Sequence, residues 1–176
     1  MENDPAQVTV QFEPKRHHSV QATRLIHEHY GTVMAYVYSR APLNQLVKDR
    51  FAGEWKYLHR ALFELPEQQA TRALIEVALY IRLVDDDEGR MGSQLRAGQV
   101  YGQLLRKDGS RVALSYRDVP NKIIHASHYE WLVDEESGDP VVMCGAGTDQ
   151  SVRGYDWDVA IVNLVSLGAI CGGLMS

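Results

Sequence analysis

The sequence predicts an α+β fold in which an N-terminal three-helix bundle packs against a small antiparallel sheet and a buried C-terminal helix. Apolar residues recur at helical spacing through residues 15–90, turn signals separate apolar runs after residue 98, and a nearly all-apolar segment closes the chain. With 176 residues and 45% hydrophobic content, the chain can bury one substantial core. We therefore expect a single domain over residues 1–176, with helices at about 15–90 and the sheet plus C-terminal helix at about 98–176.

The first half carries one strand pattern and three helix patterns. Alternating apolar residues at 8–12 predict a short strand that Pro14 ends. Ser19 can cap a helix over 19–39, Pro42 separates it from a second helix over 43–63, and Pro66 opens a third that runs to about residue 84. Amphipathic segments joined by such short links favour a compact bundle.

The second half contains two hairpin patterns. Apolar runs at 100–105 and 111–114 flank Lys-Asp-Gly-Ser, and an Asp-Gly turn is a strong hairpin signal. A second pair of strands, at 129–133 and 141–144, flanks Glu-Glu-Ser-Gly-Asp-Pro. Between the hairpins, Asp118 can cap a short helix that has Pro120 in its first turn and covers 121–126.

The final apolar segment, residues 156–173, predicts one helix that is buried on several sides. Asn163 and Gly168 interrupt it and it is short, so we expect no membrane span. Such a helix either fills the core between bundle and sheet or meets its copy in a second molecule. Together these alternatives favour a homodimer.

Net charge, the N-terminal residues and the cysteines indicate the class of partner and the cellular compartment. The net charge of −5 opposes general binding to nucleic acid. The start Met-Glu-Asn-Asp-Pro-Ala-Gln lacks the basic and apolar regions of a secretory signal, so we expect a cytoplasmic protein. Cys144 and Cys171 stand among small or apolar neighbours and are expected to be buried and reduced.

Residues 121–128, Asn-Lys-Ile-Ile-His-Ala-Ser-His, form the strongest candidate binding segment. On a helix, Asn121 and His125 share a face and His128 lies near it, so with Lys122 they could transfer a proton or hold a phosphate. If a strand begins earlier, the two histidines point to opposite faces. Alternatively, Asn121 and His125 only hydrogen-bond the backbone where the helix meets the sheet.

An acidic run, Asp85, Asp86 and Asp87, ends the third predicted helix. Carboxylates at a helix C-terminus are unfavourable, so the run could serve a cation or a basic partner. The alternative is a solvated helix end with Arg82 and Arg90 as counter-charges. Carboxylates adjacent in sequence rarely all converge on one metal ion.

Known catalytic and metal-binding motifs do not occur in the sequence. It lacks Gly-x-Ser-x-Gly, His-Glu-x-x-His, Cys-x-x-Cys, and the phosphate-loop and dinucleotide patterns. We therefore expect no cofactor and no metal. A metal-assisted hydrolase remains a third functional alternative.

Two resemblances add to this interpretation. Arg24 and His29, with four residues between them on a predicted helix, resemble the R-x4-6-H motif of HEPN-type ribonucleases, in which such residues of two subunits meet around RNA. HEPN proteins usually place a polar residue after the Arg and carry the motif on a later helix, whereas here Leu25 follows and the helix is the first. The resemblance implies a metal-independent ribonuclease that uses Arg24 and His29, with His125 as a further candidate base. It would make nucleic acid a partner.

The second resemblance covers about the last hundred residues. The stretch from Arg117 through Asn-Lys-Ile-Ile-His-Ala, with the acidic run upstream and Asp-Trp-Asp-Val-Ala-Ile downstream, is similar to small bacterial α+β proteins of unassigned activity. It implies a compact helix-plus-sheet unit and no particular reaction. The leading expectation is thus a ligand- or protein-binding module that binds a small molecule or a protein between bundle and sheet.

Overall fold

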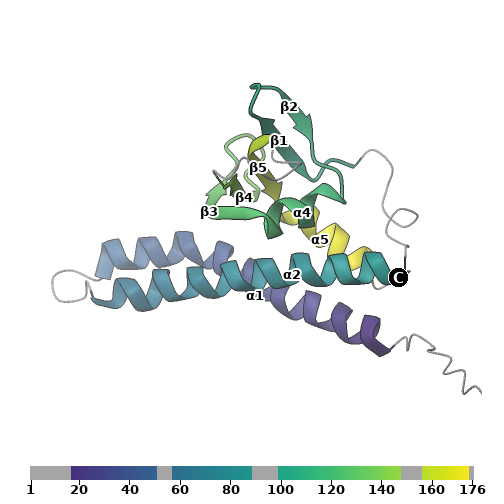
Figure 1. Cartoon of the computed structure of the whole chain (residues 1–176). Coiled ribbons are helices and arrows are strands. Elements are labelled where there is room, and N and C mark those ends of the chain that lie inside the picture. Colours follow the sequence, from purple (N-terminus) through teal and green to yellow (C-terminus); the bar gives the residue numbers. More distant parts are fainter. Residues whose placement is uncertain (1–16, 51–56, 89–98, 148–155, 175–176) are drawn as a thin grey trace, which may run out of the picture.

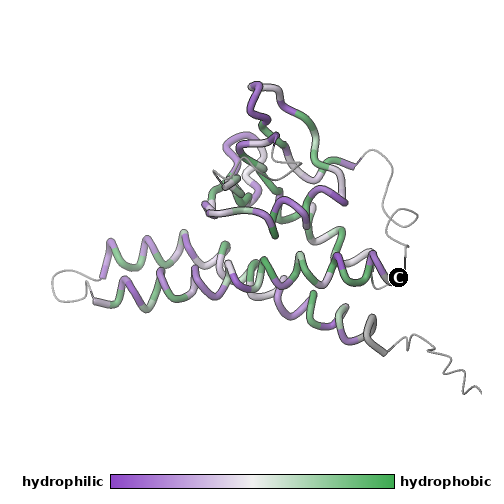
Figure 2. Tube along the Cα trace, viewed as in Figure 1, coloured by the Kyte–Doolittle hydropathy of each residue, from purple (hydrophilic) through white to green (hydrophobic). Residues whose placement is uncertain are grey.

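A long helical hairpin forms the base of the molecule (Figure 1). The computed structural model describes residues 17–50, 57–88, 99–147 and 156–174. Helix α1 (His17–Arg50) is antiparallel to α2 (Leu65–Glu88), which follows a π-helical turn, η2 (Arg60–Glu64). Apolar and polar residues alternate along both helices, as their amphipathic patterns predict (Figure 2).

The hairpin replaces the expected three-helix bundle. The helices expected at 19–39 and 43–63 are wrong as separate units, because α1 continues through Pro42 to Arg50 and the next described helical turn already leads into α2. A proline removes one hydrogen bond from a helix, and because Pro42 is exposed, water can satisfy the carbonyl that loses its partner. The strand expected at 8–12 lies outside the described residues.

The second half forms a five-stranded antiparallel sheet. Its strands are β1 (Gly102–Arg106), β2 (Arg111–Ala113), β3 (Ala126–Val133), β4 (Pro140–Ala146) and β5 (Trp157–Asn163), in the spatial order β2-β1-β5-β4-β3. Both predicted hairpins, β1–β2 and β3–β4, are confirmed, as is a short helix between them, α4 (Asp118–Ile124). The expected cap is wrong, because Asp118 is the first residue of α4 and its carboxylate accepts hydrogen bonds from Ser115. The α+β class is therefore correct.

The single helix expected over residues 156–173 is wrong in its first half. Residues 157–163 form β5 in the centre of the sheet, and only Leu164–Gly173 form helix α5. β5 is paired at both edges and carries apolar residues on both faces, which makes its sequence resemble a buried helix. Asn163 marks the change, since its side-chain oxygen accepts a hydrogen bond from the N–H of Ser166 at 2.8 Å and caps α5.

The core lies between the hairpin and one face of the sheet, and α4 and α5 complete it. One buried cluster includes Ile26 and Val77 from the hairpin, Val142 from the sheet and Ile170 from α5. Polar side chains of α1 also hold α5 in place: the Tyr30 hydroxyl donates a hydrogen bond to the Leu164 carbonyl at 3.0 Å. Beyond the sheet, the hairpin continues as a projecting arm, which we define as residues 37–50 and 57–69 (Figure 1).

Helices long and apolar enough to cross a membrane do not occur in the described part of the chain.

Candidate binding groove between the hairpin and the sheet edge

The structure brings Asn121 together with two of the predicted acids at the seam between α2 and α4. The Arg82 guanidinium donates a hydrogen bond to the Asn121 side-chain oxygen and lies 3.7 Å from the Asp86 carboxylate. Arg117 lies 3.8 Å from Asp85, whose side chain is only 10% exposed. These groups neutralise one another, so the seam is well explained as a contact that fastens α4 to α2. The side chain of Asp87 lies outside the described part of the structure.

The other predicted binding residues contact different elements. The Lys122 ammonium lies 4.7 Å from the centre of the Trp157 ring, and burial lowers its pKa against the opposing effect of Asp118. His125 follows the last residue of α4 and is exposed. His128 lies on the outer face of the sheet against Gly145, with its Nδ1 at 3.1 Å from the hydroxyl oxygen of the preceding serine. The segment 121–128 therefore divides its polar groups among several surfaces.

Arg24 and His29 also separate. Arg24 is 81% exposed and pairs with Glu28 at 2.8 Å. The His29 ring lies 3.1 Å from the Glu76 carboxylate of α2 and stacks on Tyr80 with ring centres 6.0 Å apart. Five residues along an α-helix correspond to a rotation of about 140°, so the two side chains diverge within one molecule.

The described residues provide no group of three or more histidine, cysteine, aspartate or glutamate side chains placed to hold a metal ion. Cys144 and Cys171 are free thiols and buried, as their neighbours predicted. Burial raises the pKa of each to about 12. A buried thiol with a raised pKa is a poor nucleophile, because the thiolate is the reactive form.

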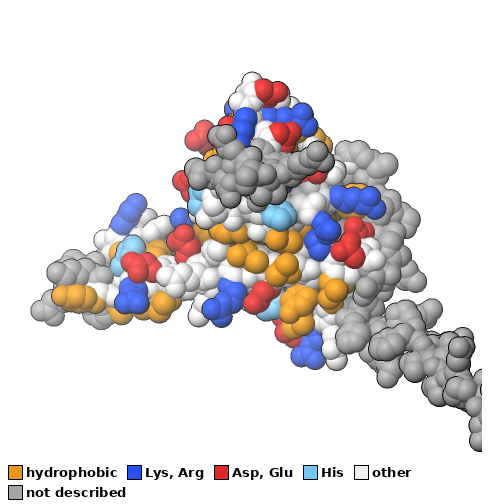
Figure 3. Space-filling model, in the orientation of Figure 1, with side chains coloured by type: hydrophobic (Ala, Val, Ile, Leu, Met, Phe, Trp, Pro, Cys, Tyr) orange, Lys and Arg blue, Asp and Glu red, His pale blue; other side chains and the backbone are white. Residues whose placement is uncertain are grey.

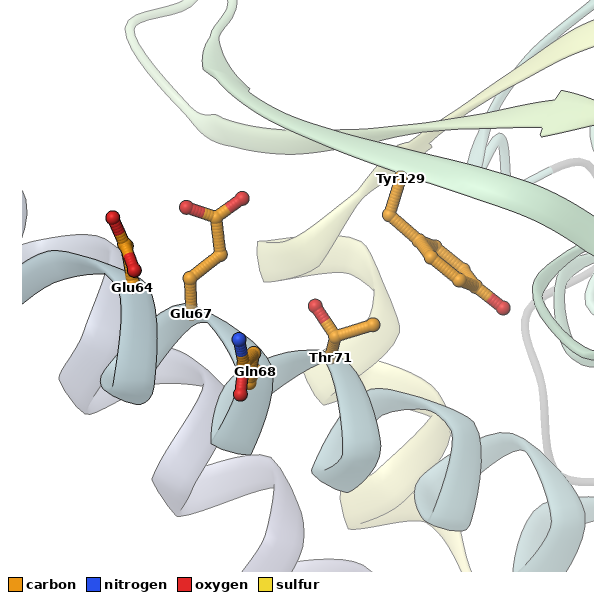
Figure 4. Close-up of a pocket in the computed structure, with 5 residues that line it drawn as sticks. All are labelled: Glu64, Glu67, Gln68, Thr71 and Tyr129. Carbon is orange, nitrogen blue, oxygen red and sulfur yellow. The ribbon is translucent and has the colours of Figure 1, made fainter. Parts of the chain in front are cut away.

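A groove with a volume of 520 Å³ lies where the start of α2 passes beneath β3. Figure 4 shows Glu67 and Thr71 pointing from α2 toward β3, and the Tyr129 ring extending from β3 toward α2. The helical residues lie three and four positions apart, which places them on one face of the helix. The lining residues are Glu64, Glu67, Gln68, Thr71 and Tyr129.

β3 supplies an open sheet edge beside this groove. It ends the strand order and pairs only with β4 among the described strands. The Asp134 N–H donates to the Asp139 carbonyl at 2.9 Å, which sets the alternation of hydrogen-bonded and non-bonded pairs along the hairpin. By that alternation, the backbone N–H and C=O groups of Tyr129, Trp131 and Val133 point away from β4.

The arm already occupies one of these backbone groups. The Arg40 guanidinium donates a hydrogen bond to the Trp131 carbonyl at 2.6 Å. The central carbon of this guanidinium lies 5.7 Å from the centre of the Tyr36 ring. Tyr36 in turn packs edge-on against Trp131 with ring centres 5.2 Å apart. The Arg40 contact occupies the Trp131 carbonyl, and the next residue whose backbone points away from β4 is Tyr129, which lines the groove.

A hydrogen bond holds Tyr129 in position at the groove. Its hydroxyl donates to the Ile123 carbonyl of α4 at 2.7 Å, and burial raises its pKa to about 12. Burial is also the main reason that the pKa of Tyr36 rises to about 12, and the Glu67 carboxylate raises it further. The β3 side of the groove is therefore pre-organised, which lowers the entropic cost of binding.

None of the groove residues was singled out in the sequence as a binding residue. Tyr129 was expected only as part of a strand, and the alternation of that strand was the one available signal. The glutamates lie near a helix start, where acids are common for electrostatic reasons alone. Their role depends on β3 being an edge strand, which follows from the position of β5 between β1 and β4. Comparison with family models, with curated proteins and with solved structures finds no match for this protein.

Proposed function

We propose that this protein is a non-catalytic binding module that captures a short, extended, basic segment of another protein in the groove between α2 and β3. The observation that carries the proposal is that Tyr129, whose backbone N–H and C=O point away from β4 by the strand register, lines the groove together with Glu67. An open strand edge and a fixed charge together provide affinity and selectivity.

The open edge favours an extended ligand. A peptide that adds to a sheet edge gains main-chain hydrogen bonds, and its alternate side chains enter pockets next to the strand. Since Arg40 occupies the Trp131 carbonyl, only a short stretch can pair at Tyr129. This limit favours a brief linear motif over a long strand.

The lining favours a basic ligand. It contains two carboxylates, an amide, a hydroxyl and a phenol, and no cationic side chain. A lysine or arginine can place its charge near Glu67 while its aliphatic part packs against the Tyr129 ring. An acidic ligand would meet repulsion in the same position.

Titration of the full-length protein with a labelled peptide of alternating lysine and threonine residues tests the proposal by fluorescence anisotropy. We expect saturable binding that weakens as ionic strength rises. Glu67→Gln should raise Kd about 2- to 5-fold, because a partly exposed ion pair contributes roughly 0.2–1 kcal/mol. Glutamine has nearly the same size as glutamate and Glu67 is only partly buried, so the fold should persist.

Glu130→Gln is the matched control, because Glu130 lies next to Tyr129 on β3 and its side chain projects from the other face. We expect it to leave Kd unchanged. A peptide of alternating glutamate and threonine should not bind. Equal binding of both peptides, or equal weakening by both substitutions, contradicts the proposal.

The alternatives from the sequence receive less support. A ribonuclease site would need Arg24 and His29 of two copies to meet around RNA, and each is already paired with an acid, Glu28 and Glu76 respectively. A metal-assisted hydrolase would need a cluster of ligands, which the described residues do not supply.

A further inference from the structure

We propose that the arm is a dimerisation element, and that the arms of two copies of this protein pack together as a four-helix bundle. Two observations carry the proposal. The two helical limbs of the arm have opposite net charges, and none of the described residues of the arm is buried. The returning limb of the arm includes Glu64, Glu67 and Gln68 of the peptide groove, so the test below measures self-association in the absence of peptide.

The arm differs from the rest of the hairpin in burial. Beneath the sheet, Ile26, Val33, Val77 and Ile81 are completely buried. In the arm, none of the described residues at 37–50 and 57–69 is buried. The contact with the sheet ends near Arg40, and the helices continue past it (Figure 1).

The arm nevertheless carries the apolar residues that a core needs. Two helices meet along a single seam and cannot surround it, so the apolar side chains in the seam stay only half-buried. These residues are Leu43, Val47, Leu58, Leu62 and Phe63. A bundle of four helices surrounds such a seam and removes it from water. Two arms supply four helices.

Further apolar side chains extend over the outside of the arm. Tyr38 is 62% exposed and Leu46 is 42% exposed, and with Pro42 they follow at intervals of four along one side of α1. Leu65 is 43% exposed on the returning helix. Figure 3 shows apolar side chains on the arm surface, interspersed with charged ones. Apolar groups rimmed by charges are typical of protein interfaces.

Charge identifies a second copy as the occupant. The described part of α1 in the arm has three cations, Arg40, Lys48 and Arg50, against Asp49, for a net charge of 3 − 1 = +2. The returning limb has Arg60 against Glu64 and Glu67, for 1 − 2 = −1, with His59 neutral. In a two-fold pair, α1 of each copy can therefore lie against the returning limb of the other with opposite charge.

The size of the arm corresponds to a small interface. Its α1 part is about 21 Å long at 1.5 Å per residue, and two helices side by side are about 20 Å wide. A flat face of these dimensions covers about 420 Å², below the roughly 600 Å² per partner at the lower end of stable specific interfaces, so we expect a dimer of micromolar affinity. Leu79 and Leu83 are also exposed, but they lie on the part of α2 whose opposite face is already packed in the core. This surface serves as the control site for substitutions in the arm.

Sedimentation equilibrium of the full-length protein tests the proposal. We expect a dimer, and we expect Leu46→Glu to weaken it more than 10-fold, because a charge would enter the new core. Leu79→Glu makes the same change at a similarly exposed site outside the arm and should leave the dimer intact. Circular dichroism checks that both variants keep their helical content.

A charge exchange makes the test specific to the proposed pairing. One variant carries Lys48→Glu with Arg50→Glu, and a second variant carries Glu64→Lys. Each should self-associate more weakly than the parent, and a mixture of the two should form a mixed dimer. A parent that is monomeric even at about 100 µM, far above a micromolar Kd, overturns the proposal. Insensitivity to Leu46→Glu, or equal loss with Leu79→Glu, overturns it as well.

Discussion

At the scale of single residues, Gly102 shows where side-chain size decides the fold. It starts β1 with a φ of +147°, and a Cβ at this position would lie 2.0 Å from the Ile161 backbone oxygen of β5. We predict that Gly102→Ala lowers the free energy of unfolding by about 3 kcal/mol or more, because backbone strain and a clash with backbone combine. Urea denaturation measures the change.

Gly138 provides the comparison. It has a φ of +75° in the β3–β4 turn, and a Cβ there would meet no atom within 4 Å. Gly138→Ala should therefore cost only the strain of about 1 kcal/mol. If both substitutions lower the free energy of unfolding equally, β5 lies farther from β1 at Gly102 than the structure shows.

Residue type alone did not locate the candidate site. Asn121 and Asp85 were expected to bind a ligand, and the structure places both against arginines at the α2–α4 seam. Glu67 and Tyr129 line the groove and carried no such expectation. Polar side chains near each other in sequence satisfy one another as readily as they serve a ligand, and only their neighbours in space distinguish the two cases.

At the scale of elements, the prolines of the hairpin have different effects. Pro42 leaves α1 continuous, whereas Pro66 follows directly on the π-helical turn, in which the Leu65 N–H donates to the Arg60 carbonyl. A proline ring crowds the carbonyl four residues earlier, and a wider turn relieves that crowding. The sequence predicted a break at both positions, because local preference does not include the packing that keeps a helix intact.

We predict that Pro42→Ala stabilises the arm. The alanine restores an N–H donor for the Tyr38 carbonyl and should raise the free energy of local opening by about 1–3 kcal/mol. Amide hydrogen exchange across residues 37–50 measures this quantity. Asn44→Ala, also exposed on α1, should add only a helix-propensity gain of about 0.5 kcal/mol. An equal gain from both substitutions would mean that Pro42 does not weaken α1.

At the scale of the whole molecule, buried tyrosines and cysteines predict the response to alkaline pH. Burial is the first cause of raised pKa values, to about 12, for Tyr30, Tyr36, Tyr129, Cys144 and Cys171. A group whose pKa is higher in the folded state stabilises the fold fully below its unfolded pKa, and this contribution disappears as pH rises through the folded value. Stability should therefore be steady up to about pH 9 and fall toward pH 12.

Urea midpoints measured across this pH range test the prediction. Tyr129→Phe removes one titrating group together with its hydrogen bond to Ile123, so it should lower stability at pH 8 and make the alkaline decline shallower. A midpoint that stays constant from pH 9 to pH 12 contradicts the assignment of these groups to the seams between hairpin and sheet.

Several parts of the fold followed from the sequence by itself, because a few adjacent residues carry their signals. Asp108 and Gly109 make the β1–β2 turn, and Pro120 lies in the first turn of α4. Amphipathic spacing identified the helical half. These features depend on turn chemistry and periodicity, which act within one or two turns of the backbone.

Only the tertiary structure decided that α1 passes through Pro42, that residues 157–163 form a strand, and that β3 lies at the edge of the sheet. Each of these depends on partners far away in the sequence. An apolar run satisfies its backbone equally well as a helix or as a strand between two others, and the choice rests on whether neighbouring strands leave a place for it. The groove exists because β5 takes the central position and leaves β3 with one open side.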